Sequence, residues 1–548
     1  MTDFFTHHRA LLDDALTALT TRKFWTPFPE IPSGKLYGET ARGDGESAWQ
    51  ALLGKPFDLP DHPGIGRVGA EVSPWGLDLG ITYPAADPDT LIAAAEGAAS
   101  AFAEAGVERR VGALLEALVR LNRMSFLLGH ATMHTTGQAF AMAFQAGGPH
   151  AQDRGLEAVA VAYAELTRYA RDAVWEKPQG KHAPLVIEKH WTLVPRGPAL
   201  TIGCNTFPTW NGYPGLFASL ATGNPVIVKP HPRAILPLAL TVRVLREVLA
   251  EAGLPADAVV LAADAPGEEI TKTLVADDRI AMIDYTGSTA FADWIRANTS
   301  ALVFTEEAGV NSVTITGTDD FDGMCANLAF SLSLYSGQMC TSPQNLYVPK
   351  DGIETDAGHK SFDAVAEGIK AAIDALLSDP DRAAGVCGTI VNPDTLKRVE
   401  AARGAGRVLR DSAETGKGRS ATPLMCLAEG ESGPQDDECF GPVSFVVPCD
   451  SAEDAIARAA NIARRKGAIT AALYATDEAL IDRAARAFAQ AGVNLSVNLT
   501  GNIYVNQSAA FSDFHVTGAN PAGNASLTDT AFVAPRFRRV MIRRPKTA

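Results

Sequence analysis

Residues 223–262 read GNPVIVKPHPRAILPLALTVRVLREVLAEAGLPADAVVLA, and this stretch decides the fold. The apolar run Pro225–Val228 has the length of a buried strand, and apolar positions recur at helical spacing over Leu236–Ala252. The turn Gly253–Pro255 ends that helix, and a second apolar run follows at Val259–Ala262. Buried strands that alternate with helices predict a parallel sheet covered on both faces.

The same alternation continues on both sides of this stretch. Helical periodicity covers residues 89–169, and strands are predicted over 184–195 and 280–285. A second set of strands and helices runs from Asn311 to Ala491. We therefore predict an α/β protein of two domains with a small additional β element.

Composition and charge narrow the class of protein. The 548 residues carry 48 Lys and Arg against 63 Asp and Glu, which gives a formal net charge of −15. Such an acidic chain does not favour a nucleic acid or an anionic membrane as its partner. Hydrophobic residues make up 46% and charged residues 20%, which is typical of a folded soluble protein and not of a disordered one.

The cysteines and the apolar segments bear on the compartment. Seven cysteines without a C-x-x-C pair predict free thiols, with neither a disulfide framework nor a metal site. The N-terminus lacks a basic region followed by an apolar core. Residues 197–228 carry no charge, but four prolines and five glycines interrupt them too often for a membrane helix. These features predict a cytoplasmic protein.

The segment 336–342, SGQMCTS, places Cys340 after a Gly-Gln turn and ahead of a predicted strand. A cysteine at an exposed tip near free backbone N–H groups has the setting that a nucleophile needs. The alternative is a buried structural cysteine, because free cysteines are among the most buried residues. The segment alone leaves both interpretations open.

Two further turns combine acids or glycine with the end of a strand. In 304–312, FTEEAGVNS, two acids close an apolar run, where a desolvated carboxylate would act as a base toward water. A solvated acidic turn is the alternative. Gly287 and Ser288 stand between a strand and a helix, where free N–H groups can bind phosphate, although both are also ordinary turn residues.

Two other positions favour contacts with a ribose. Lys229 ends a buried strand, at the edge where parallel sheets bind ligands, and a solvated lysine is the alternative. Glu438 stands two residues before Phe440, so an acid that could hold a ribose and a phenyl that could pack on a ring lie close together. Taken alone, this second segment is an acidic loop before a strand.

The order and spacing of these positions resemble the aldehyde dehydrogenase superfamily over about residues 90–520. The matching positions in chain order are Asn205, Lys229, Gly287, Ser288, Glu307, Cys340, Glu438 and Phe440. Glu307 and Cys340 are 33 residues apart, close to the separation in the superfamily. The resemblance implies an aldehyde dehydrogenase fold with one cofactor domain and one catalytic domain.

The resemblance also implies a mechanism. Cys340 would attack the aldehyde carbon to give a thiohemiacetal, and hydride transfer to a nicotinamide would leave a thioester. Glu307 would activate the water that hydrolyses the thioester. The Cys340 backbone N–H and the Asn205 side chain would stabilise the oxyanion.

The same resemblance assigns the cofactor contacts. Lys229 and Glu438 would bind the riboses, and Phe440 would pack near the nicotinamide. Gly287 and Ser288 would meet the pyrophosphate.

The preference between the two nicotinamide cofactors follows from the residues after Lys229. Three residues beyond it, superfamily members that prefer NAD often carry a Glu, whereas this chain has Pro232 between His231 and Arg233. Because no carboxylate there would repel a 2′-phosphate, we predict NADP as the preferred cofactor and NAD as the alternative.

Two positions depart from the pattern of the superfamily. Its Asn directly before Phe-Pro is Thr206 here, so either Asn205 reaches the oxyanion or that donor has changed. The usual Glu-Leu-Gly-Gly-Lys reads Glu-Ala-Gly-Val-Asn over 307–311. We prefer Glu307 to Glu306 as the base because a glycine follows it two residues later.

Within the superfamily, the likeness is greatest to the members that act in phenylacetic acid degradation, through residues 203–234 and the TEEAGVNS segment. It implies an aldehyde from aromatic acid breakdown, such as a CoA-linked semialdehyde, with the loop 511–515 lining the substrate tunnel. One alternative is a dehydrogenase that passes the acyl group to CoA, which Glu307 argues against. Another is a binding homologue without turnover.

The resemblance also divides the chain. The divisions are 1–172 with 198–306 for the NAD(P)-binding domain, 307–510 for the catalytic domain, and 173–197 with 511–548 for oligomerisation strands and a C-terminal tail. An Arg-rich strand over 532–544 is expected at a subunit interface, and the alternative is contact with CoA phosphates. Because a long exposed edge strand invites aggregation, we expect a homodimer or homotetramer.

Overall fold

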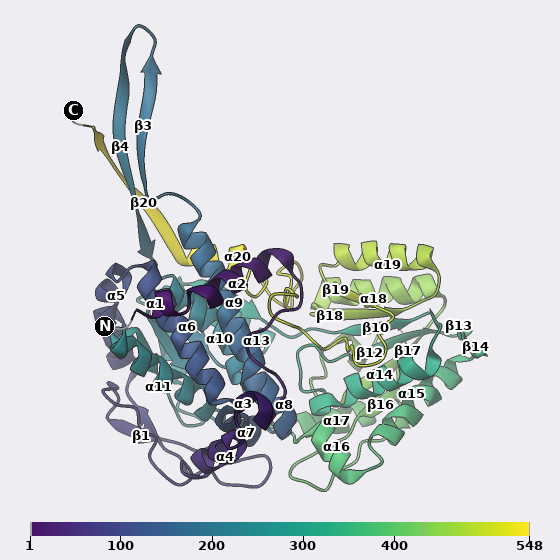
Figure 1. The fold of residues 1–548 in the computed structure, drawn as a ribbon. Coiled ribbons are helices and arrows are strands. Elements are labelled where there is room, and N and C mark those ends of the chain that lie inside the picture. The colour runs from purple at the N-terminus through teal and green to yellow at the C-terminus, as the bar shows by residue number, and fades with distance from the viewer. Residues whose placement is uncertain (1–2, 431, 547–548) are drawn as a thin grey trace.

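The computed structural model describes residues 3–430 and 432–546. Within these ranges the chain forms two α/β lobes, and a long β ribbon projects from the first of them (Figure 1). This confirms the predicted α/β class with two large sheets and a small β element. None of the helices in these ranges combines the length and the apolar character that crossing a membrane requires.

The first lobe is built on a five-stranded parallel sheet of strand order β7-β6-β5-β8-β9. Its central strands are apolar and buried, which is why they read as short continuous apolar runs. The strands are β5 (Ala199–Ile202), β6 (Val226–Lys229), β7 (Val259–Leu261), β8 (Met282–Thr286) and β9 (Leu302–Glu306). Because they are parallel, Lys229, Thr286 and Glu306 end at the same edge of the sheet.

Helices cover this sheet on both faces. The crossover helices are α10 (Pro208–Ala221), α11 (Leu236–Glu251), α12 (Ile270–Val275) and α13 (Thr289–Asn298). The long helices predicted over 89–169 are α5 (Pro88–Glu104), α6 (Val107–Arg123), α7 (Ser125–Thr136), α8 (Phe140–Gly147) and α9 (Pro149–Thr167). Asp87 begins α5 by accepting a hydrogen bond from the Thr90 N–H at 2.9 Å.

The N-terminal residues, which showed no clear periodicity, fold onto these helices. They form α1 (Phe4–His7), α2 (Arg9–Thr21), α3 (Gly34–Tyr37), α4 (Ala41–Gln50), β1 (Gly66–Val68) and β2 (Tyr83–Ala85). Their aromatic residues join the main core, where Phe4, Phe28 and Trp49 are buried. The extension is therefore an integral part of the first lobe.

The second lobe is built on a seven-stranded sheet of order β15-β16-β17-β12-β10-β18-β19, parallel except for the β15 edge. Its strands are β10 (Ser312–Ile315), β12 (Asn345–Pro349), β15 (Arg407–Arg410), β16 (Leu424–Leu427), β17 (Val443–Cys449), β18 (Thr470–Tyr474) and β19 (Asn494–Val497). Its helices are α14 (Phe321–Ser333), α15 (Phe362–Leu376), α16 (Pro380–Cys387), α17 (Asp394–Arg403), α18 (Ala452–Lys466) and α19 (Glu478–Gln490). A small sheet joins β11 (Gly317–Thr318), β13 (Ile353–Thr355) and β14 (Gly358–Lys360).

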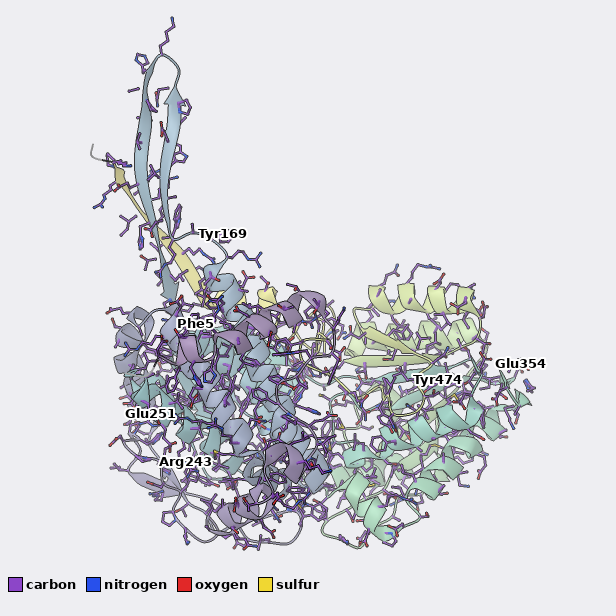
Figure 2. All side chains as sticks on the ribbon, viewed as in Figure 1. Phe5, Tyr169, Arg243, Glu251, Glu354 and Tyr474 are labelled. Carbon is purple, nitrogen blue, oxygen red and sulfur yellow. The ribbon has the colours of Figure 1, made fainter. Side chains whose placement is uncertain are left out.

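The projecting ribbon is a three-stranded antiparallel sheet of order β20-β4-β3. It consists of β3 (Asp172–Gln179), β4 (His182–Pro195) and β20 (Phe537–Pro545), and Tyr169 lies at its base (Figure 2). The predicted C-terminal strand over 532–544 is thus a short helix α20 (Thr530–Val533), a turn and then a strand. Residues 511–528 do not join the ribbon but contact both lobes, through Glu306 of the first and Ala468 of the second.

A buried ion pair fixes the base of the C-terminal strand. Arg536, directly before β20, donates to both carboxylate oxygens of Asp284 on β8, at 2.5 and 2.8 Å, and to Ser219 Oγ at 2.7 Å. The Arg536 side chain is fully buried. Since a bidentate pair fixes orientation as well as distance, it fixes the start of the ribbon against the first sheet.

Candidate active site

A strained turn presents Cys340. Tyr335 and Ser336 follow α14 with φ of 50° each, in the left-handed region that side chains disfavour. Gly337 has φ of 63°, and a Cβ there would lie 2.2 Å from the carbonyl oxygen of Gly441. The turn therefore requires glycine, and it delivers a half-buried Cys340 to the loop ahead of β12.

The altered motif residue Asn311 supports the loop that carries Cys340. Its Nδ2 donates to the carbonyl oxygens of Cys340 at 2.8 Å and Ser342 at 2.9 Å. Its Oδ1 accepts from the backbone N–H groups of Ile469 at 2.9 Å and Thr470 at 3.1 Å. The amide thus links the cysteine loop to the second sheet.

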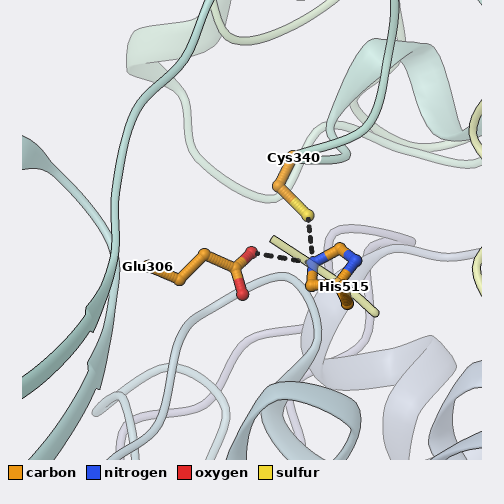
Figure 3. Close-up of side chains that lie close together, drawn as sticks. All are labelled: Glu306, Cys340 and His515. Carbon is orange, nitrogen blue, oxygen red and sulfur yellow. Dashed lines mark hydrogen bonds and ion pairs between the residues drawn. The ribbon is translucent and has the colours of Figure 1, made fainter. Parts of the chain in front are cut away.

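Glu306 and His515 converge on Cys340 (Figure 3). The Cys340 Sγ lies 3.8 Å from His515 Nε2, and the same nitrogen lies 3.3 Å from Glu306 Oε1. The sulfur, the ring nitrogen and the carboxylate oxygen all lie within 4.8 Å of one another. Glu306 and His515 are both buried. Three segments far apart in the sequence therefore meet at one point.

The structure corrects our choice between the two adjacent acids. The Glu307 carboxylate binds Arg296 Nη1 at 2.5 Å and accepts from Thr305 Oγ1 at 2.7 Å, whereas Glu306 faces Cys340. Glu306 is the last residue of β9 and Glu307 follows it, and the two adjacent side chains point in different directions. The structure therefore does not bring Glu307 to the cysteine, because the glycine two residues later does not determine which way an acid points.

Burial and nearby charges determine the pKa values of Cys340 and Glu306. Burial raises the pKa of the Cys340 thiol well above its usual range, and the negative charge of Glu306 raises it further. Burial alone would also raise the pKa of Glu306, but His515, Cys340 and Arg154 together outweigh it and hold that pKa below its usual value. These shifts favour an ionised carboxylate at Glu306 and disfavour a thiolate at Cys340 wherever no cation lies beside the sulfur.

The predicted cofactor residues lie at the carboxyl edge of the first sheet and across the groove. Lys229 Nζ binds Asp264 Oδ1 at 2.6 Å and the Pro230 carbonyl at 2.7 Å. Burial lowers the pKa of Lys229 and raises that of Asp264, and their attraction opposes both shifts. Because the two are buried together after neighbouring strands, Asp264 is a candidate binding residue that the sequence analysis missed.

Gly287 and Ser288 occupy the turn between β8 and α13. Ser288 caps α13 by accepting from the Phe291 N–H at 3.4 Å, and a Cβ at Gly287 would lie 2.3 Å from Tyr285 Oη. This leaves a tight turn whose first helical N–H groups face outward, the arrangement that binds a pyrophosphate. The residues present therefore fit a dinucleotide at this edge.

Glu438 and Phe440 come from the second lobe. Glu438 Oε1 accepts from the Gly309 N–H at 3.2 Å, only three residues beyond Glu306. Burial raises the pKa of Glu438 to about 7. Phe440 is half-buried, and its carbonyl accepts from Arg398 Nη1 at 3.2 Å. The ribose candidate of the second lobe thus contacts the segment that directly follows Glu306.

A family model described as the aldehyde dehydrogenase family matches residues 79–523. The chain belongs to the aldehyde dehydrogenase family. The aldehyde dehydrogenase fold is confirmed by the crystal structure of an NAD-dependent aldehyde dehydrogenase from Burkholderia multivorans, with a TM-score of 0.98 and 52% identity over the whole of both chains. The family is one of oxidoreductases that oxidise aldehydes with NAD or NADP.

Other relatives are more distant. The benzaldehyde dehydrogenase [NAD(+)] of Pseudomonas putida is 26% identical over 418 residues, covering 74% of this chain and 80% of its own. A 1-pyrroline-5-carboxylate dehydrogenase from Thermus with bound NAD matches the fold with a TM-score of 0.73, at 20% identity over 96% of this chain and 99% of its own. The relatives carry different substrate names, so the family does not fix the substrate.

The oxyanion residue of this aldehyde dehydrogenase stays a prediction. Asn205 lies half-buried in the loop between β5 and α10, and its Oδ1 has no hydrogen-bond partner among the described residues. Among those residues, Asn205 makes no hydrogen bond to Cys340 either. The neighbouring Thr206 is held through its carbonyl by Gln138 Nε2 at 2.8 Å.

A different asparagine of the dehydrogenase reaches the cluster. Asn211 on α10 donates from Nδ2 to Glu306 Oε2 at 3.1 Å, and the Cys204 thiol lies 3.6 Å from Asn211 Oδ1. Trp210 packs edge-on against the His515 ring, with ring centroids 4.6 Å apart. The sequence analysis missed Asn211 and gave His515 only as part of the tunnel loop, since nothing local marks either one.

We expect the stability of the dehydrogenase to depend on pH through the half-buried Glu438. Its pKa is about 7 in the folded chain, against about 4.3 in an unfolded one. The folded chain therefore binds a proton that the unfolded chain releases, so the free energy of unfolding falls as pH rises through this window. Glu438→Gln removes this effect, and its stability relative to the wild type should increase from pH 5 to pH 8.

Thermal unfolding midpoints at a series of pH values measure this difference. The expected gain is up to about 1.4 kcal/mol for each pKa unit of the shift. Glu414→Gln, at an exposed position, serves as the matched control and should track the wild type. Parallel curves for the wild type and Glu438→Gln would show that Glu438 is not a raised, buried acid.

Proposed function

We propose that this dehydrogenase oxidises an aldehyde to a free carboxylic acid through a covalent thioester on Cys340. The observation that carries the proposal is the buried Glu306 carboxylate beside the cysteine. A base held ionised next to a thioester can take a proton from the attacking water, so the acyl group leaves as an acid. We assign this step to Glu306 in place of Glu307.

Each residue has one task in the proposed sequence. The Cys340 sulfur attacks the carbonyl carbon, and the Cys340 N–H with the Asn205 amide stabilises the oxyanion. The bound nicotinamide supplies the acceptor for the hydride of the thiohemiacetal. Lys229 and Glu438 would hold the riboses of the cofactor, Gly287 and Ser288 would orient the pyrophosphate, and Phe440 would pack near the nicotinamide. Glu306 then removes the proton of the hydrolytic water.

We propose an aromatic or CoA-linked aldehyde as the substrate, as expected for a protein like the phenylacetic acid degradation protein PaaN. An aromatic side chain at the cluster supports this choice, because Trp210 packs on His515. One relative is named benzaldehyde dehydrogenase, which is consistent with an aromatic substrate. Seven free cysteines support a cytoplasmic setting.

We propose NAD as the working cofactor and revise the expectation of NADP. That expectation rested on His231 and Arg233 beside Pro232. Burial, with the charge of Lys229, lowers the pKa of His231 to about 4, so His231 carries no charge near neutral pH. The Asp264 carboxylate beside Lys229 would accept from ribose hydroxyls and repel a 2′-phosphate.

Matched variants of the two adjacent acids test the proposed chemistry. Cys340→Ser should lose turnover on a panel of aliphatic, aromatic and CoA-linked aldehydes, read as reduced nicotinamide. Glu306→Gln should give a single burst of reduced cofactor and then stop, because the thioester is no longer hydrolysed. Glu307→Gln should keep turnover within a few-fold of the wild type, since that acid binds Arg296.

Mass spectrometry of the stalled Glu306→Gln protein should find the acyl group on the Cys340 peptide. A stall in Glu307→Gln with normal turnover in Glu306→Gln would reverse the assignment. If turnover requires added CoA and yields an acyl-CoA, then the acyl group passes to CoA and not to water, and the proposed hydrolysis is wrong. Cofactor binding without turnover on any aldehyde would favour a binding homologue.

The cofactor proposal predicts a change in specificity at Asp264. We expect kcat/KM of the wild type to be at least about ten-fold higher with NAD than with NADP, since one carboxylate–phosphate repulsion is worth roughly 1.4 kcal/mol or more. Asp264→Asn keeps the shape and removes the charge, so the ratio should shift toward NADP. Asp278→Asn, an exposed acid ahead of β8, is the control. Equal rates with both cofactors in the wild type would contradict the proposal.

We propose that the ribbon of β3, β4 and β20 joins subunits into a homodimer or homotetramer. Its strands expose apolar side chains to solvent, namely Val174, Trp175, Leu185, Val540, Met541 and Ile542. Exposed apolar strands invite pairing with another chain, and a homo-oligomer with closed symmetry would cover them. This also supports the predicted subunit role of the Arg-rich strand over contact with CoA.

Light scattering after size exclusion tests the ribbon. The wild type should have two or four times the monomer mass, and Val174→Lys with Ile542→Lys should shift it toward the monomer by placing charge in the interface. Leu36→Lys alters an equally exposed leucine outside the ribbon and should leave the mass unchanged. A monomeric wild type, or an unchanged assembly in the double variant, would overturn the proposal.

A further inference from the structure

His515 has no task in the proposed reaction, yet its ring contacts the sulfur. Its Nε2 faces both the Cys340 Sγ at 3.8 Å and the Glu306 Oε1 at 3.3 Å (Figure 3). A bare Nε2 lone pair would face a carboxylate lone pair, which is unfavourable. A proton on that nitrogen turns the contact with Glu306 into a charge-assisted hydrogen bond.

The ordinary basicity of the two candidate acceptors favours the imidazole. A thiol proton could pass to His515 or to Glu306, and an imidazole has an ordinary pKa about two units above that of a glutamate. Transfer to His515 gives an imidazolium between a carboxylate and a thiolate, so every buried charge has an opposite neighbour. Transfer to Glu306 would leave a buried thiolate with no cation beside it.

The surroundings add no competing cation within hydrogen-bond reach of the sulfur among the described residues. The groups that act on Cys340 are the Glu306 carboxylate, the Cys204 thiol and Glu438, and each raises the thiol pKa. The charge of Arg154 helps to lower the pKa of Glu306, and its guanidinium lies 5.0 Å from the Trp210 ring centroid. An imidazolium at His515 is therefore the neighbouring cation that can stabilise a Cys340 thiolate against the negative charge of these groups.

The ring is held firmly enough to serve as a proton acceptor. The His515 carbonyl accepts from the Leu527 N–H at 2.9 Å, and Trp210 packs edge-on against the ring. The following residue, Val516, has φ of 58°, a costly conformation for a β-branched residue. A backbone conformation of this kind persists only where the surrounding structure enforces it.

We propose that His515 is a catalytic residue that accepts the proton of Cys340, so that the attacking nucleophile is the thiolate of a thiolate–imidazolium pair. The neutral ring starts with its proton on Nδ1 and a bare Nε2. The S–H bond breaks, its electron pair stays on sulfur, and an N–H bond forms at Nε2 to give the imidazolium. The cluster keeps its net charge of −1, because Glu306 stays ionised and free to activate water later. The inference rests on Cys340 as the proposed nucleophile, but its test needs neither aldehyde nor cofactor.

Alkylation of the protein by iodoacetamide over pH 5–10 measures the thiolate directly. Peptide mass spectrometry follows the Cys340 adduct, and Cys340→Ser gives the background. The wild-type rate should reach a plateau below about pH 8.5, where an ordinary thiol only begins to ionise. His515→Gln should react about ten-fold or more slowly at pH 7, with its rate rising only in the alkaline range.

Matched variants separate the possible acceptors. Glu306→Gln should lower the rate less than His515→Gln, since it removes a neighbour of the imidazolium and not the acceptor. His359→Gln alters a remote, exposed histidine that also pairs with a glutamate, Glu354 at 3.0 Å, and should behave as the wild type. Added imidazole should restore the reaction of His515→Ala. A His515→Gln protein with the wild-type profile, or a Glu306→Gln protein with the larger loss, would overturn the proposal.

One measurement does not depend on whether the histidine variants fold. The ultraviolet absorbance of a thiolate, taken as the difference between the wild type and Cys340→Ser, should be present at neutral pH. Its appearance only in the alkaline range would overturn the inference even if dehydrogenase activity is found. Its presence at neutral pH with no activity on any aldehyde would leave the inference standing while the proposed function fails.

Discussion

The buried ion pair of Arg154 and Glu157 on α9 holds the chain segment on which the candidate active site depends. Both side chains are fully buried, with Nη1 and Oε2 3.0 Å apart. Glu157 accepts from the Phe511 N–H at 2.9 Å and from Thr528 Oγ1 at 2.6 Å. Arg154 donates to Ser508 Oγ at 2.8 Å. The pair fixes both ends of the segment that carries a histidine to the groove between the lobes.

That arrangement explains how a site can form from segments of different lobes. The acid ends a strand of the first sheet, the cysteine comes from a strained turn of the second lobe, and the histidine comes from the returning segment. No two of them share a local element, so their approach depends on the long-range contacts of α9, Asn311 and Arg536. Such contacts act together, and removing one partner leaves a buried polar group unsatisfied.

The sequence predicted the sheets and the cysteine because both have local signatures. Apolar runs such as Pro225–Val228 mark buried strands, and the Gly-Gln turn marks Cys340. It could not choose between Glu306 and Glu307, because that choice depends on the direction in which each side chain points where β9 ends. It could not find the role of His515, which lies 175 residues from Cys340, nor Asp264, which lies 35 residues beyond Lys229.

The two adjacent acids at the end of β9 lie in different electrostatic environments. Glu307 faces Arg296, so its charge is neutralised within the first lobe. Glu306 faces the groove, where an amide and an imidazole are its hydrogen-bond partners and no arginine among the described residues pairs with it. A carboxylate in that position is available to attract a proton, but it also disfavours a thiolate nearby. An imidazole between acid and sulfur resolves this conflict, because its positive form stabilises both anions without consuming the carboxylate.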